Sequence, residues 1–320
     1  MPLIDMSLEE LVEYKGRNPK PKDFDQYWER ALAEMEAVDA KVDFVRSEFQ
    51  VPFAECFHLY FTGVKGARIH CKYVKPKYTS QPHPAVIQFH GYTVNSGEWA
   101  SLLSIASLGY SVIAMDVRGQ GGYSEDTGGV RGNTHHGHII RGLDDEGADH
   151  LLFRHIFLDT AQIARIVMDL PEVNEERVIA TGWSQGGALT LACAALEPRI
   201  KKAAPVYPFL SDYQRVWEMD LAKDAYHELK EYFRHFDPQH KREEEIFTKL
   251  GYIDIQHLAP RIKADVLMAV GLMDTVCPPS TQFAAYNKIT SSKRYELYPD
   301  FGHEHLPGHP DRILQYILDI

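Results

Sequence analysis

The chain has 320 residues, enough to bury a sizeable hydrophobic core, and its 44% hydrophobic and 25% charged residues are an ordinary globular composition. This composition excludes an intrinsically disordered protein and a coiled coil. The formal net charge of −11 argues against a nucleic-acid partner and against a membrane partner with anionic lipids, because both select a basic face.

The cysteines and the N-terminus indicate the compartment. Residues 1–7 contain no basic region followed by an apolar stretch, and no run approaches about 18 apolar residues. The four cysteines lie far apart and follow no Cys-x-x-Cys spacing: Cys56, Cys71, Cys193 and Cys277. We therefore expect a soluble cytoplasmic protein with free thiols.

The first part of the chain predicts helices followed by strands. Residues 1–40 read as an N-terminal helical extension, in which Ser7 and Glu10 have the spacing of a capping box. Strand patterns follow at 42–50, 56–62 and 67–74, and they are typical of antiparallel strands that open a sheet.

From residue 84 the pattern alternates between strands and helices. Buried-strand patterns cover 85–89, 110–115, 177–181, 202–207, 265–270 and 294–298. Helical patterns lie between them at about 99–108, 153–169, 186–196, 279–289 and 309–319. The alternation predicts an α/β protein with a mostly parallel central sheet and helices on both faces, whose functional residues follow the carboxyl ends of the strands. No interdomain linker is visible, so we expect one domain over residues 1–320.

Two segments interrupt this alternation. Residues 116–150 form a long connection without periodicity, and loops of that length are usually functional or interfacial. Residues 209–258, rich in aromatic and charged residues, predict a helical insertion between two strands. The insertion either forms a lid or wall of a pocket or packs as ordinary helices.

The sequence Gly-Trp-Ser-Gln-Gly at 182–186 lies between a strand pattern and a helix pattern. This is the Gly-x-Ser-x-Gly arrangement of a nucleophile elbow. Side chains in place of Gly182 and Gly186 would collide with the neighbouring strand and helix, and the turn lifts the Ser184 hydroxyl to the start of a helix. The alternative is a serine in a Gly-rich turn without function, and the partners of Ser184 decide between the two.

A serine nucleophile requires a histidine base and a carboxylate that orients it, in the chain order Ser, Asp or Glu, His in this fold. Asp274 and His303 each follow a later predicted strand, so they are the predicted partners of Ser184. Asp300 suits a local loop role better, and Asp265 lies at a strand start, on the opposite edge of the sheet.

The oxyanion of the tetrahedral intermediate requires backbone N–H donors. We expect one from Gln185, which follows the nucleophile, and one from Tyr92, in the loop after the strand that ends at Phe89.

Metal and cofactor chemistry are not predicted. A group of histidines lacks matching carboxylate or cysteine spacing: His135, His136 and His138. Four residues after His303 comes Pro307, so the His-Glu-x-x-His zinc motif is absent. Residues 118–122 do not have the Gly-x-Gly-x-x-Gly pattern of a dinucleotide site.

These residues together resemble the acetyl xylan esterase/cephalosporin C deacetylase family (carbohydrate esterase family seven), a branch of the α/β-hydrolase fold. The resemblance rests on three motifs: Arg118-Gly119-Gln120, Gly182-Trp183-Ser184-Gln185-Gly186 and His303-Glu304. Segments 23–28, 208–212 and 271–280 extend it over nearly the whole chain.

The resemblance implies a cytoplasmic serine esterase that removes acetyl groups from short xylo-oligosaccharides and from cephalosporin C, with a preference for acetyl over longer acyl groups. It also implies a ring-shaped homohexamer with catalytic sites facing an internal cavity and an interface loop after Arg118. Trp183 departs from the small residue or proline usual in the family; it either narrows the acyl pocket or packs under the elbow.

Other functions on the same fold are a broader short-chain carboxylesterase, a long-chain carboxylesterase, a peptidase or a binding protein without catalysis. A peptidase of this kind would usually bring a large extra domain, for which 320 residues leave little room. The presence of Ser184, Asp274 and His303 argues against the binding protein.

Overall fold

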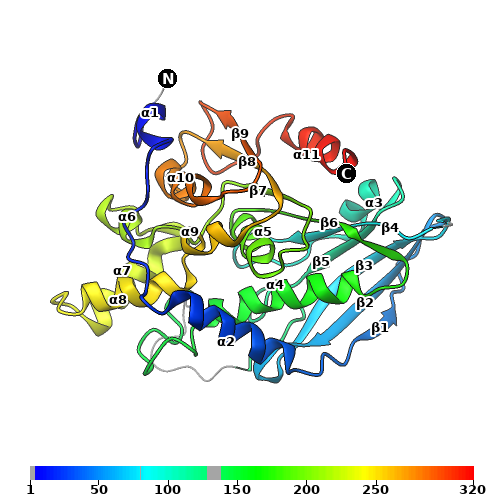
Figure 1. Ribbon diagram of the computed structural model, residues 1–320, viewed down its shortest axis with the longest axis horizontal. Coiled ribbons are helices and arrows are strands. Elements are labelled where there is room, and N and C mark those ends of the chain that lie inside the picture. Colours follow the sequence, from blue (N-terminus) through cyan, green and yellow to red (C-terminus); the bar gives the residue numbers. More distant parts are fainter. Residues whose placement is uncertain (1–3, 80, 128–137) are drawn as a thin grey trace.

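The computed structural model describes residues 4–79, 81–127 and 138–320 (Figure 1). Within these residues one nine-stranded sheet has the order β1-β2-β3-β5-β4-β6-β7-β8-β9. Its strands are β1 (Asp43–Arg46), β2 (Ala54–Thr62), β3 (Arg68–Pro76), β4 (His83–Phe89), β5 (Ser111–Met115), β6 (Val173–Trp183), β7 (Lys202–Val206), β8 (Asp265–Gly271) and β9 (Lys293–Tyr298). Pairing is antiparallel from β1 to β5 and parallel from β5 to β9, which confirms the predicted α/β architecture.

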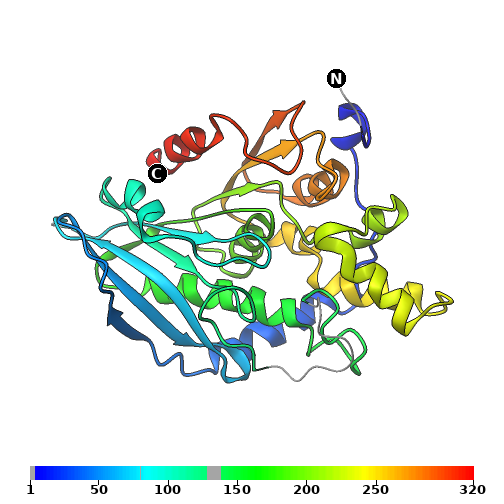
Figure 2. The same ribbon diagram turned by 180° about the vertical axis from the view of Figure 1, so that it is seen from behind.

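Helices cover both faces of this sheet (Figures 1 and 2). The larger apolar cluster lies on the face of α2 (Phe24–Glu36), α4 (Leu152–Met168), α5 (Gln185–Leu196) and α10 (Pro279–Lys288). The smaller cluster lies on the face of α3 (Trp99–Ala106) and α11 (His309–Leu318). Neighbouring residues of β4 divide between them, Ile87 in the first and Val86 in the second, because successive side chains of a strand point to opposite faces.

The segments outside the alternating pattern lie at the N-terminus, after β5 and between β7 and β8. At the N-terminus, α1 (Leu8–Leu11) begins with the predicted capping box of Ser7 and Glu10. Between β7 and β8 the insertion contains α6 (Tyr213–Glu218), α7 (His227–Phe236), α8 (Glu243–Leu250) and α9 (Ile255–Leu258), with 3₁₀ turns at Asp224–Tyr226, Gly251–Ile253 and Ala259–Arg261. The described parts of the long connection, 116–127 and 138–150, contain turns but no helix or strand. No described helix combines the length and the apolar character that a membrane span requires.

A buried ion pair attaches the start of the long connection to α4. The Arg118 guanidinium donates to both carboxylate oxygens of Asp159, from Nε at 2.7 Å and from Nη2 at 2.6 Å, and both side chains are at most 1% exposed. Burial raises the pKa of Asp159, and the charge of Arg118 opposes that rise. A Cβ on Gly63 would lie 2.5 Å from the Asp159 carboxylate, so this glycine makes room for the pair.

We expect Arg118→Met to lower the free energy of unfolding by about 3–5 kcal/mol, because it leaves the Asp159 carboxylate buried without its partner. Urea denaturation measures the change. The control is Arg118→Met combined with Asp159→Leu, which removes both charges and should recover most of the loss. A single variant as stable as the wild type would contradict the buried pair.

Candidate active site

The turn between β6 and α5 places Ser184 in a strained backbone conformation, with φ 58° and ψ −119°. Such a conformation costs about 1–3 kcal/mol and persists only where the surroundings enforce it. Here they do, because a Cβ on Gly186 would lie 2.0 Å from the Phe89 carbonyl oxygen and a Cβ on Gly182 would lie 2.5 Å from Gly186. The predicted elbow glycines are therefore required by close contact with the end of β4.

Three side chains that follow different strands form one hydrogen-bonded chain. His303 Nε2 lies 2.9 Å from Ser184 Oγ, and His303 Nδ1 lies 2.8 Å from Asp274 Oδ2. The other Asp274 oxygen accepts the N–H groups of Val276 and Cys277, both at 2.8 Å. These contacts fix the carboxylate, and an N–H on Nδ1 leaves the Nε2 lone pair facing the serine.

The rival carboxylates do not contact His303. Asp265 lies at the start of β8, where it accepts the Ser292 hydroxyl at 2.6 Å, and Asp300 is exposed. Glu304 accepts the Gly302 N–H at 3.1 Å and so braces the loop that carries the histidine.

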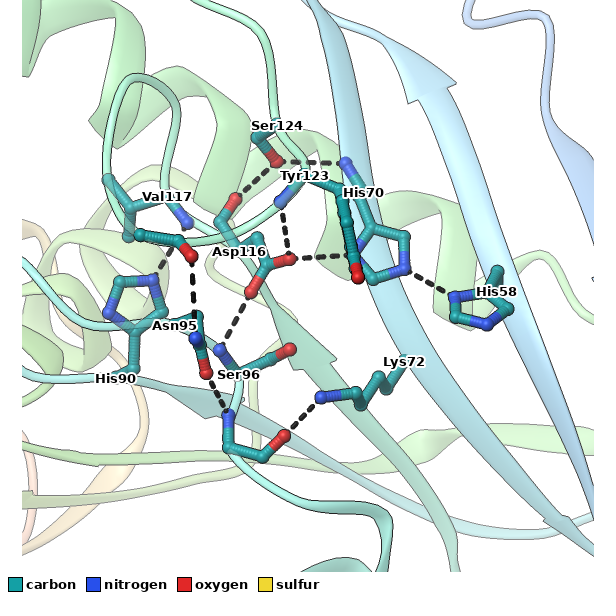
Figure 3. A network of polar contacts seen from close by, with 12 residues as sticks. His58, His70, Lys72, His90, Asn95, Ser96, Asp116, Val117, Tyr123 and Ser124 are labelled. Carbon is teal, nitrogen blue, oxygen red and sulfur yellow. Dashed lines mark hydrogen bonds and ion pairs between the residues drawn. The ribbon is translucent and has the colours of Figure 1, made fainter. Parts of the chain in front are cut away.

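The loop after β4 holds the Gly91–Tyr92 peptide in one orientation. The Gly91 carbonyl accepts from His90 Nδ1 at 2.7 Å and from Gln185 Nε2 at 3.3 Å. On its other side, His90 Nε2 accepts the Val117 N–H at 2.9 Å (Figure 3). Because N–H and C=O of a trans peptide point in opposite directions, the Tyr92 N–H is fixed as well. Among the described residues, no group of the chain accepts the backbone N–H of Tyr92 or of Gln185.

Gln120 connects the Gln185 side chain with Thr93, the residue after Tyr92. Its amide and that of Gln185 form a reciprocal pair at 2.7 and 3.0 Å, and Gln120 Oε1 also accepts the Thr93 N–H at 2.9 Å. Gly119 adopts a φ of +70°, and its carbonyl accepts from His138 Nε2 at 3.1 Å. The structure therefore places the Arg-Gly-Gln motif as support for the loops beside the elbow.

Asp116, which sequence reasoning missed, joins the same loops from beyond β5 (Figure 3). Its carboxylate accepts the Ser96 N–H at 2.7 Å, the Tyr123 N–H at 3.0 Å and His70 Nδ1 at 2.6 Å. Burial raises the pKa of Asp116, but these hydrogen bonds outweigh burial and hold it well below its usual value. In the sequence, only its position directly after the buried strand pattern at 110–115 could have indicated a role at the site.

Aromatic side chains contact the Trp183 ring. Its ring stacks on His305 with centroids 6.2 Å apart, meets His309 edge-on and packs against Tyr207. The Tyr207 ring in turn lies 4.5 Å from that of His303. These contacts favour a packing role for Trp183, which joins the elbow to the histidine loop and to α11.

The described residues contain one group with three potential metal ligands. The ligand atoms of Asp274, Cys277 and His303 lie within 4.8 Å of one another, but His303 and Asp274 already hydrogen-bond to each other. Of the histidine group considered for a metal, His138 contacts Tyr92 and Gly119. The other two, His135 and His136, lie outside the described residues.

The buried side chain of His309 should make the free energy of unfolding depend on pH. Its side chain is fully buried, neither ring nitrogen has a hydrogen-bond partner among the described residues, and burial lowers its pKa to about 4. In the unfolded chain this imidazole binds a proton near pH 6.5, whereas in the folded chain it does so only near pH 4. The free energy of unfolding is therefore unaffected by this group above pH 6.5 and falls by up to about 3 kcal/mol as the pH decreases to 4. His309→Phe keeps a ring against Trp183 and should reduce this loss, as measured by urea unfolding across pH 4–7. An unchanged pH dependence would contradict the burial of a neutral imidazole.

Comparison with known proteins identifies the family. The acetyl xylan esterase (AXE1) family matches residues 1–320. The crystal structure of acetyl xylan esterase 1 from Thermoanaerobacterium sp. JW/SL YS485 is 64% identical, with a TM-score of 0.97 over 99% of both chains. The acetyl xylan esterase from Paenibacillus sp. R4 is 37% identical, with a TM-score of 0.91 over 98% of this chain and 99% of that chain.

A more distant relative is the acetyl esterase Axe7A of Xylanibacter ruminicola, 27% identical over 298 residues. The alignment covers 91% of this chain, which spans 64% of the length of that relative. With the whole-chain match and the 64% identical structure, the chain belongs to the acetyl xylan esterase (AXE1) family, a family of carboxylic ester hydrolases.

Proposed function

We propose that this protein is a serine esterase that removes acetyl groups from acetylated xylo-oligosaccharides. Ser184 is the nucleophile, His303 the general base and Asp274 the carboxylate that orients the base. The observation that carries this proposal is the hydrogen-bonded chain of these three side chains, at 2.9 and 2.8 Å, on a strained elbow.

The first half of the reaction acylates the serine. His303 Nε2 takes the hydroxyl proton while Ser184 Oγ attacks the acetyl carbonyl carbon, and the carbonyl electron pair moves onto oxygen. The Asp274 carboxylate stabilises the imidazolium that forms. When the tetrahedral intermediate collapses, the sugar oxygen leaves and takes the proton from His303.

In the second half, a water molecule gives a proton to His303 and attacks the acetyl-enzyme, and acetate is released with Ser184 reprotonated. In both halves the negative charge develops on the former carbonyl oxygen. The N–H groups of Tyr92 and Gln185 stabilise this charge, and the contacts to the Gly91 carbonyl orient the Tyr92 N–H before the reaction begins.

The relatives support this substrate class, because they are acetyl xylan esterases and an acetyl esterase. Deacetylation of cephalosporin C breaks the same kind of bond and is proposed as a second activity. A broader short-chain carboxylesterase with the same site would differ only in how large an acyl group it accepts.

We also propose that the chain folds as one domain, acts in the cytoplasm and assembles as a homohexamer through the connection at 116–150. The continuous sheet supports the first of these proposals, and the length of the connection supports its use as an interface.

Replacement of Ser184 by alanine tests the chemistry. We expect kcat for acetyl esters to fall about 10⁴-fold or more, because the nucleophile is lost. Acetate release measures the effect, and Ser104→Ala, at an exposed serine of α3, serves as the matched control. Activity within tenfold of the wild type would refute Ser184 as the nucleophile.

Substrate preference is tested separately by acetate release from acetylated xylo-oligosaccharides and cephalosporin C, beside p-nitrophenyl esters of two to eight carbons. We expect acetate release from the first two and a steep fall of kcat/KM beyond the shortest acyl chains, because the family resemblance implies a preference for acetyl over longer acyl groups. If the protein prefers longer acyl chains and releases no acetate, the Ser184 mechanism can stand but the proposed deacetylase activity is wrong.

A further inference from the structure

A buried carboxylate of the insertion contacts the loop that carries the proposed oxyanion donor. Glu228 of α7 is 2% exposed, and its Oε1 accepts the hydroxyl of Tyr92. Its Oε2 accepts the backbone N–H groups of Ile139 at 2.8 Å and of Ile140 at 3.2 Å. One carboxylate thus joins the insertion, the loop after β4 and the long connection.

The Tyr92 side chain is held on its faces as well as at its hydroxyl. Its ring packs against Phe209, with centroids 5.5 Å apart, and meets His138 edge-on at 5.3 Å. Phe209 in turn donates its N–H to the Ser184 carbonyl at 3.1 Å. The position of the phenol is therefore linked to the elbow through one residue.

The backbone beside Tyr92 requires such support. Thr93 adopts a φ of +62°, and a β-branched residue in this region is strained by about 1–3 kcal/mol. Gln120 holds the Thr93 N–H, and the phenol of Tyr92 provides the anchor on the other side. Without that anchor, the Gly91–Tyr92–Thr93 backbone can relax and turn the Tyr92 N–H away from the oxyanion.

We propose that Glu228 is a positioning residue for the esterase reaction: by holding the Tyr92 phenol, it aims the Tyr92 N–H at the developing oxyanion. The inference rests on the proposed function of Ser184 and of the Tyr92 amide. It gives the insertion a role in transition-state stabilisation, through a residue that touches neither the substrate nor Ser184.

The hydrogen bonds around Glu228 indicate which substitution should be tolerated. A glutamine can accept the two isoleucine N–H groups with Oε1 and donate from Nε2 to the Tyr92 oxygen. The Tyr92 hydroxyl can then donate to His138 Nδ1, 3.2 Å away, while His138 Nε2 remains on the Gly119 carbonyl. The two isoleucine N–H groups and the Tyr92 hydroxyl each keep an acceptor, whereas leucine fills a similar volume and offers no acceptor.

The experiment compares Glu228→Leu with Glu228→Gln, with activity expressed per active site titrated to completion by a fluorophosphonate. We expect Glu228→Leu to lower kcat about 10- to 100-fold with KM within threefold, because a misplaced donor loses transition-state binding alone. Glu228→Gln should stay within about fivefold of the wild type. Glu231→Leu, on the same helix, is the matched control.

Tyr92→Phe supplies the second measurement, which does not depend on whether Glu228→Leu folds. It breaks the same link and should lower kcat per site to a similar extent. In the Tyr92→Phe background, Glu228→Leu should add less than threefold, because both changes act through one contact.

Three outcomes would overturn the inference. In the first, Glu228→Leu contains fewer titratable sites, but each site has a normal kcat. In the second, Tyr92→Phe has a normal kcat per site. In the third, the effects of Glu228→Leu and Tyr92→Phe multiply in the double variant. A wild-type protein that neither reacts with the fluorophosphonate nor releases acetate would instead refute the proposed function.

Discussion

The contact between the elbow and the end of β4 is the constraint on which the site depends. The Ser184 backbone keeps its strained geometry because Gly182 and Gly186 allow the turn to lie directly against the Phe89 carbonyl. This close approach sets the loop after β4 beside the first turn of α5. The two proposed oxyanion amides therefore become neighbours although they lie far apart in the sequence.

Buried carboxylates hold the loops around this contact. Asp274 and Glu228 each accept two backbone N–H groups and one side-chain donor, and Asp116 does the same. A buried carboxylate is costly unless such donors surround it. The donors fix the direction of each carboxylate, so these residues specify loop conformation more than they add to net stability.

The balance between burial and hydrogen bonding differs between two of these carboxylates. The pKa of Asp116 lies well below its usual value because its donors outweigh burial. The pKa of Glu228 is raised because burial outweighs the donation from Tyr92 and the backbone. The neutral glutamine of Glu228→Gln resembles the protonated carboxyl group of Glu228. Because the pKa of Glu228 is raised and that of Asp116 is lowered, Glu228 is the easier of the two carboxylates to protonate.

The sequence predicts those residues of the site whose position follows from local pattern. Ser184 occupies a motif between a strand and a helix, and Asp274 and His303 follow later strands in the order that the fold requires. Parallel strands place such residues at one edge of the sheet, which is why the hydrogen-bonded chain could be anticipated and why Asp265, at the opposite edge, could be set aside.

The supporting residues could not be anticipated in this way. Glu228 and Tyr92 are 136 positions apart, and no sequence motif distinguishes Glu228 from Glu231, the other acidic residue of α7. The contacts of Trp183 depend on where α11 and the loop before it pack, because His309 and His305 supply two of its ring contacts. Contacts of this kind follow from tertiary packing, which neither periodicity nor strand order encodes.

The anchoring of the insertion determines whether it acts as a wall or as a lid. Near its start, buried Asp212 accepts the N–H groups of Arg17 and Asn18 at 2.9 and 2.7 Å and the Tyr14 hydroxyl at 2.8 Å. Farther along, Glu228 holds the loop after β4. A lid motion would have to break both buried carboxylate clusters and would displace Tyr92 as it opened. The contacts of Glu228 and Asp212 therefore favour an insertion that stays in place, and its opening would disturb the proposed orientation of the Tyr92 N–H.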